Sequence, residues 1–89
     1  MARVELYTTT SCPFCVCAKR LLQARGVPYE EFDVGVDEEL RVEIVARTGR
    51  RTVPQIFIDG RAIGGFDELA ALDTAGELAT LVPQADEGS

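Results

Sequence analysis

The sequence predicts a single α/β domain in which helices flank a four-stranded mixed sheet. Short apolar strands alternate with amphipathic helices in the order β-α-β-α-β-β-α, followed by a final helical turn. The Asp59-Gly60 pair between two apolar runs is typical of a tight hairpin, which makes the last two strands antiparallel. The length of 89 residues fits one domain. We assign that domain to residues 1–83 and predict a flexible polar tail over residues 84–89.

The first half of the chain predicts a strand, a helix and a second, parallel strand. Val4–Tyr7 alternates apolar and polar residues, as a short strand does. A helix is expected over Cys12–Gln23, because Pro13 suits a first helical turn and Gly26 is a suitable C-terminal cap. Tyr29–Val34 predicts the second strand. Two strands joined through a helix in this way are parallel neighbours in a sheet.

The second half predicts a helix, a hairpin and closing helical segments. Asp37 is a good N-cap for the second helix, and Gly49 is expected to end it. The remaining expected elements are a third strand over Val53–Ile58, its hairpin partner over Arg61–Ile63, and helices over residues 66–73 and 76–82.

Composition excludes several classes of function. The net charge of −6 disfavours nonspecific binding to nucleic acid. No apolar run reaches the length of a signal peptide or a membrane span, so we expect a cytoplasmic protein without a membrane partner. The charge is uneven, because residues 1–26 and 47–66 each hold four basic residues against one acidic residue. These two basic segments contain most of the candidate site residues, although solvated helix faces explain the same pattern.

The sequence Cys12-Pro13-Phe14-Cys15 is the main chemical signal. Thiol–disulfide exchange needs one thiolate that attacks and a second thiol that resolves the mixed disulfide. Cys12 is expected at the start of a helix, where unpaired N–H groups and the helix dipole stabilise a thiolate. Cys15 lies about one turn further on, within reach of Cys12 and deeper in the helix. We therefore predict Cys12 as the nucleophile, Cys15 as the resolving thiol, and a redox-active disulfide between them.

The sequence gives weaker evidence for a function of Cys17 and for a bound zinc ion. Cys17 points roughly 140° around the helix from Cys12, so we expect a packing residue, with a regulatory or cluster-binding role as the alternative. Structural zinc requires four nitrogen or sulfur ligands. The chain has three cysteines and no histidine, so we expect no bound metal.

Three ordered motifs together resemble a known family. These are Tyr7–Cys15, Thr52–Ile58 and Gly64–Leu69, and they resemble the corresponding motifs of glutaredoxins. The similarity covers about residues 3–82 and is greatest to bacterial dithiol glutaredoxins of the glutaredoxin 3 kind. It implies a thioredoxin-like fold and a glutathione-disulfide oxidoreductase that reduces protein disulfides and glutathione mixed disulfides. Many members carry a lysine shortly before the first cysteine, whereas this chain has only Thr8–Ser11 there.

The resemblance also implies where glutathione, the co-substrate, binds. Pro54 should follow a cis peptide bond and face Cys12, and the Val53 backbone should pair with the cysteinyl part of glutathione. The helix that opens near Gly65 should hold the γ-glutamyl carboxylate on its free N–H groups, and Asp67 should pair with the ammonium. Taken alone, Asp67 is a routine helix N-cap. The full expected set is Arg50, Arg51, Thr52, Val53, Pro54, Gly65, Phe66 and Asp67, with Arg50 or Arg51 meeting the glycyl carboxylate.

The expected role is electron transport in cell redox homeostasis, by a monomer. Expected partners are glutathione and disulfide-containing or glutathionylated proteins, with ribonucleotide reductase as one candidate. Two alternatives share the fold. One is a carrier of a [2Fe-2S] cluster held between two chains, and the other is a redoxin reduced by thioredoxin reductase.

Overall fold

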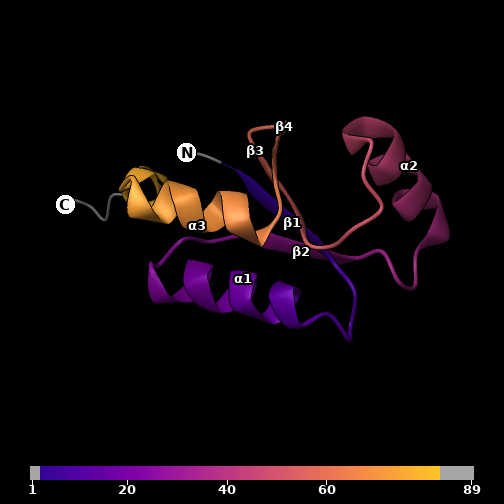
Figure 1. Cartoon of the computed structure of the whole chain (residues 1–89), viewed down its shortest axis with the longest axis horizontal. Helices are drawn as coiled ribbons and strands as arrows, with labels where there is room; N and C mark the ends of the chain where they lie inside the picture. The colour runs from indigo at the N-terminus through magenta and orange to yellow at the C-terminus, as the bar shows by residue number, and fades with distance from the viewer. Residues whose placement is uncertain (1–2, 83–89) are drawn as a thin grey trace.

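The computed structural model describes residues 3–82, which form a mixed sheet covered by helices on both faces (Figure 1). The four strands are β1 (Val4–Thr8), β2 (Glu30–Asp33), β3 (Gln55–Ile58) and β4 (Arg61–Gly64). Their order across the sheet is β2-β1-β3-β4. Strand β1 pairs in parallel with β2 and antiparallel with β3, and β3 pairs antiparallel with β4.

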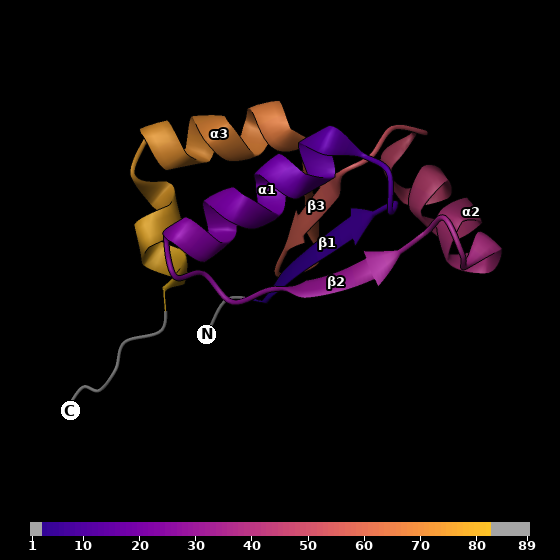
Figure 2. The ribbon, with the colours of Figure 1, turned by 90° about the horizontal axis from the view of Figure 1, so that it is seen from below.

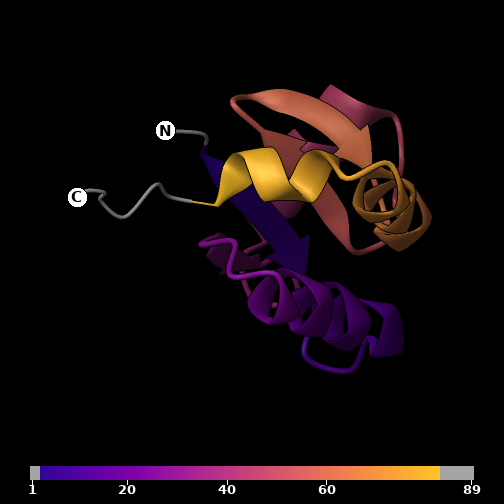
Figure 3. The ribbon, with the colours of Figure 1, turned by 90° about the vertical axis from the view of Figure 1, so that its left-hand side faces the viewer.

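The helices divide between the two faces of the sheet. Helices α1 (Pro13–Ala24) and α3 (Phe66–Thr74) lie side by side on one face (Figure 2). The short 3₁₀ helix η1 (Glu77–Leu81) runs back from α3 toward β1 (Figure 3). Helix α2 (Glu38–Thr48) packs against the other face.

Each face of the sheet buries its own apolar cluster. The cluster beneath α1, α3 and η1 comprises Val4, Leu6, Ala18, Leu22, Val27, Ile56, Leu69 and Leu78. The smaller cluster beneath α2 comprises Tyr7, Val34, Ile44 and Phe57. Successive side chains of β1 point to opposite faces of the sheet, so Leu6 lies in the first cluster and Tyr7 in the second. Both clusters therefore anchor the end of β1 that leads to Cys12.

The ends of α2 follow the rules that predicted them. The Asp37 carboxylate accepts a hydrogen bond from the Leu40 N–H at 3.0 Å, and Glu38 and Glu39 occupy the first turn. Gly49 adopts φ 71°, and its N–H bonds the Val45 carbonyl. A left-handed residue at this position closes the last turn and favours glycine.

The structure confirms the predicted fold class and element order and corrects several boundaries. Helix α1 starts at Pro13 with Cys12 as its N-cap. Gly26 ends the helix as expected, because it adopts φ 72° directly after Arg25 and its N–H bonds the Gln23 carbonyl. Strand β3 starts at Gln55 because the preceding proline has no N–H for the ladder. The last helix is a 3₁₀ segment rather than an α-helix. The predicted tail over residues 84–89 lies outside the described residues. Within residues 3–82, every helix is too short or too polar to span a lipid bilayer.

Candidate active site

Cys12 is held between the start of α1 and the loop before β3. Its Sγ accepts a hydrogen bond from the Cys15 N–H at 3.2 Å, the bond that an N-cap side chain makes to the third helical residue. The Cys12 thiol also donates to the Val53 carbonyl at 3.5 Å. Only 9% of the residue is exposed. A thiolate here would therefore gain the Cys15 N–H and the positive end of the helix dipole as stabilising partners.

Cys15 occupies a different environment one turn further along α1. It is 1% exposed and forms no disulfide in this structure. Burial, together with the hydrogen bond to Cys12, raises the pKa of the Cys15 thiol to about 12, although nearby Lys19 opposes this shift. At neutral pH Cys15 is therefore a neutral thiol, and its role as the resolving thiol stays a prediction.

Cys17 lies on the outer face of α1 and is exposed, so the expectation that it packs at a boundary is wrong. The predicted angular separation explains this position. The buried residues of α1 are Cys15, Ala18 and Leu22, and Cys17 falls outside that stripe.

The loop opposite Cys12 is fixed by a residue that sequence reasoning did not single out. The Val53-Pro54 peptide bond is cis, as the resemblance implied. Gln55, only 2% exposed, donates from Nε2 to the Thr52 carbonyl at 2.9 Å and to Thr52 Oγ1 at 3.3 Å. This side chain ties the loop to β3 and so positions Val53 against Cys12. Its position directly after the proline of the motif was the available signal.

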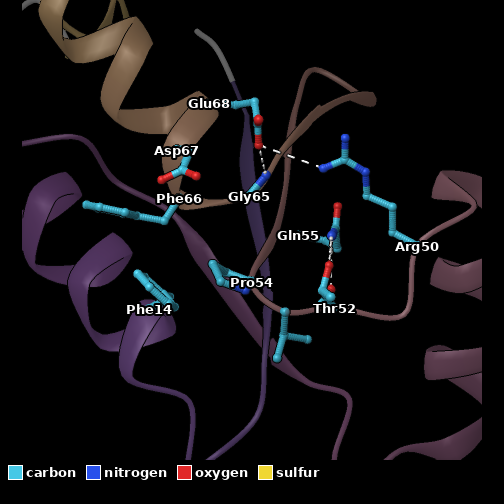
Figure 4. A pocket seen from close by; sticks show the side chains of 10 residues that line it. Phe14, Arg50, Thr52, Pro54, Gln55, Gly65, Phe66, Asp67 and Glu68 are labelled. Carbon is cyan, nitrogen blue, oxygen red and sulfur yellow. Dashed lines mark hydrogen bonds and ion pairs between the residues drawn. The ribbon is translucent and has the colours of Figure 1, made fainter.

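A cavity of about 220 Å³ opens beside this loop and reaches the start of α3 (Figure 4). Its walls are Phe14, Arg50, Thr52, Val53, Pro54, Gln55, Gly65, Phe66, Asp67 and Glu68. The rings of Phe14 and Phe66 lie 6.2 Å apart and form the side nearest α1. Seven of the eight residues expected to bind glutathione therefore line one cavity.

The start of α3 presents free N–H groups to this cavity. Gly65 is the N-cap, so the reading of Asp67 as the N-cap is wrong. The Glu68 carboxylate accepts the Gly65 N–H at 2.7 Å. Gly64 has φ 117°, and the Glu68 side chain lies where a Cβ on Gly64 would project. Because glycine has no side chain to cap the first turn, the following N–H groups are available to an anion.

Of the two neighbouring arginines, only Arg50 reaches the first cavity. Arg50 lines the first cavity, and its Nη1 lies 3.8 Å from Glu68 Oε1 (Figure 4). Arg51 is absent from that cavity, and both arginines line a second one, of about 100 Å³, together with Thr9, Arg41 and Val53. Arg41 was missed because a single arginine on a helix gives no local signal. Val53 borders both cavities, so the two lie on either side of the backbone that faces Cys12.

The family model for glutaredoxin matches residues 4–63 of the sequence. The chain belongs to the glutaredoxin family. It is 49% identical over 82 residues to glutaredoxin 3 of Escherichia coli strain K12, covering 92% of this chain and 99% of that protein. The crystal structure of a buckwheat glutaredoxin–glutathione complex matches with a TM-score of 0.82 at 26% identity, over 91% of this chain and 76% of that one. The solution structure of a Brucella melitensis glutaredoxin matches with a TM-score of 0.80 at 44% identity, over 92% and 89% respectively.

Glutaredoxin membership confirms the predicted family, the thioredoxin-like fold and the oxidoreductase class. The described residues place the N-cap sulfur of Cys12 beside Cys15 and against Val53, which lines the cavity that reaches the start of α3. Among residues 3–82, no three metal-ligating side chains converge.

Proposed function

We propose that this glutaredoxin reduces glutathione mixed disulfides and protein disulfides, with glutathione as its reductant. The observation that carries the proposal is the position of Cys12. Its sulfur caps α1, contacts the Val53 carbonyl and lies against a backbone segment bordered by two cavities. A disulfide lying along Val53 would therefore present a sulfur atom to a thiolate held at a helix N-terminus.

The dithiol reaction proceeds in two exchanges. The Cys12 thiolate attacks one sulfur of the substrate disulfide, and the other substrate sulfur leaves as a thiolate. Cys15 then attacks the Cys12 sulfur, forms the Cys12–Cys15 disulfide and displaces the second substrate sulfur. The proton lost by Cys15 passes to the departing thiolate. Because the pKa of Cys15 is raised, this proton transfer accompanies the attack rather than preceding it.

Glutathione restores the dithiol. One glutathione thiolate attacks the Cys12–Cys15 disulfide at Cys12, and Cys15 leaves and takes up a proton. A second glutathione thiolate attacks the sulfur of the bound glutathione and releases Cys12 with oxidised glutathione. Two glutathione molecules thus supply the two electrons. A glutathionylated protein would enter this cycle directly at the mixed disulfide with Cys12.

The two cavities suggest how glutathione is oriented. Its cysteinyl backbone would pair with Val53. Its γ-glutamyl carboxylate would meet the N–H groups at the start of α3, and the ammonium would meet Asp67. The glycyl carboxylate would then point to the opposite side of Val53, where Arg41 and Arg51 line the second cavity. These arginines would replace the charge of the lysine that Thr8–Ser11 lacks.

The proposed partners and setting follow from this chemistry. Protein substrates would carry a disulfide or a glutathionyl group, and ribonucleotide reductase is a candidate. We propose that the protein acts in the cytoplasm, because three free thiols suit a reducing compartment.

The deciding experiment compares two reductants with bis(2-hydroxyethyl) disulfide as substrate. With glutathione, glutathione reductase and NADPH, we expect NADPH to be consumed. With thioredoxin reductase and NADPH but without glutathione, we expect no comparable rate, and the opposite pattern would contradict the proposal.

A substitution tests the proposed contact with the glycyl carboxylate. Arg51→Ala should raise the KM for glutathione by about threefold to tenfold, as expected for the loss of one charged contact. Arg61→Ala, at an exposed position, is the control and should leave the KM unchanged.

A further inference from the structure

A third cavity, of about 550 Å³, extends from the second one along α2. We call it the α2 groove. Its walls include Val34, Glu38, Arg41, Val42, Val45 and Arg51. Four of these residues, Val34, Arg41, Val45 and Arg51, also line the cavity beside Val53. The α2 groove is therefore continuous with the backbone that faces Cys12.

The α2 groove has an apolar edge that the fold does not require. Val42 is 64% exposed on α2, and Val36, in the loop that leads to α2, is 82% exposed. The buried anchor of α2 is Ile44 instead. Valine is also a poor choice for an exposed helix position on propensity grounds. Exposed apolar side chains beside a cleft mark a surface that binds a partner.

The same groove carries positive charge in an acidic protein. Arg41 and Arg51 form no ion pair with any other residue in 3–82. Glu38 is the one acidic residue on the wall, against these two guanidinium groups. The chain as a whole has a net charge of −6. A carboxylate on a partner would therefore find its complement here.

We propose that the α2 groove binds the polypeptide segment that follows the reactive cysteine of a protein disulfide substrate. This inference rests on the proposed function, because the orientation of glutathione sets the direction. A peptide pairing with Val53 in the same sense would run from the start of α3, past Cys12, toward Arg41 and Arg51. The groove would select a carboxylate soon after the cysteine and an apolar side chain beside Val42.

Two synthetic peptide disulfides of identical composition test the direction. Both have blocked termini and form symmetric disulfides. In the first, Asp and Leu follow the cysteine, and in the second they precede it. We expect glutathione-supported reduction of the first peptide to have a kcat/KM about tenfold higher, the effect of burying one aliphatic side chain. Equal values for the two peptides would overturn the proposal.

Variants at Val42 test the location. Val42→Asp should lower kcat/KM for the first peptide about tenfold and leave the second peptide and bis(2-hydroxyethyl) disulfide unchanged. Val42→Lys should have a smaller effect, because it keeps the attraction for the carboxylate. Ala71→Asp, the same change in charge at an exposed position of α3, should change none of the three rates.

The outcomes separate this inference from the proposed function. If wild-type protein fails to reduce even bis(2-hydroxyethyl) disulfide with glutathione, the proposed function itself is wrong. If the small disulfide is reduced and Val42→Asp leaves the first peptide unaffected, only the α2 groove assignment is wrong. A concentration-dependent dimer that Val42→Asp dissociates would make a second copy of the chain the occupant and would also overturn it.

Discussion

Alkylation of the reduced protein over a range of pH tests whether Cys15 is a buried, neutral thiol. The perturbation is addition of iodoacetamide, which reacts with the thiolate form of cysteine. Cys17 provides an internal reference, because it is exposed on the same helix while Cys15 is 1% exposed. We expect Cys17 to react readily and Cys15 to remain protected.

The expected difference follows from the thiolate fractions. With a pKa of about 12, Cys15 is a thiolate in only about one molecule in 10⁴ at pH 8. A free thiol with an ordinary pKa of about 8.5 is ionised in about a quarter of molecules at that pH. Ionisation alone therefore slows Cys15 about a thousandfold, and its burial adds to the protection. The Cys15 rate should rise about tenfold per pH unit as long as the protein stays folded.

Fragment-ion mass spectrometry of quenched samples measures each cysteine separately. A Cys15 alkylation rate that levels off near pH 9, or that equals the Cys17 rate at pH 8, would refute the reasoning.

The raised pKa of Cys15 also affects the pH dependence of folding stability. The unfolded chain releases the Cys15 proton first, so this contribution to stability is complete below about pH 8.5 and is lost as pH rises toward 12. Cys15→Ser should weaken this alkaline loss in urea titrations.

Three further substitutions test the site and the core. Asp67→Asn should raise the KM for glutathione about threefold to tenfold with little change in melting temperature, because it removes only the proposed charge for the ammonium; an unchanged KM would contradict that role. Glu68→Ala should lower the stability by about 1 kcal/mol, seen as a fall in melting temperature of about 4–8 °C, because Gly65 loses its acceptor. Most of that loss should remain at high salt, since the Arg50–Glu68 pair is exposed and contributes little. Leu22→Ala removes a fully buried side chain and should cost about 2–5 kcal/mol in urea unfolding, whereas a cost below 1 kcal/mol would refute its place in the core.

Much of the fold could be predicted because its signals are local. The Asp59-Gly60 hairpin, the Asp37 cap and the Gly49 stop each depend on a few adjacent residues, and each appears in the structure as expected. The boundaries that moved depend on tertiary context. Pro54 was placed within a strand by its apolar neighbours, but it lacks the N–H that the ladder needs, so β3 begins after it.

The residues of the candidate site could be predicted where they belong to a sequence motif. They could not be predicted where only the three-dimensional fold brings them to the site. Cys12 and Cys15 could be assigned roles because their spacing and position on a helix carry the chemistry. That Arg50 borders both cavities while Arg51 is absent from the first could not be foreseen, because the surrounding fold decides where adjacent loop side chains lie. Arg41 reaches the second cavity only through the packing of α2 against a distant loop, so its place there has no local signal in the sequence.

Variants that retain a single cysteine test most directly the proposal that Cys12 is the nucleophile. One variant retains only Cys12, through Cys15→Ser and Cys17→Ser, and the other retains only Cys15, through Cys12→Ser and Cys17→Ser. Each is assayed for reduction of a small glutathione mixed disulfide with glutathione, glutathione reductase and NADPH. We predict that the variant with Cys12 alone turns over substrate and that the variant with Cys15 alone is about a thousandfold slower or inactive, in line with its thiolate fraction. Activity in the Cys15-only variant, or none in the Cys12-only variant, would contradict Cys12 as the nucleophile.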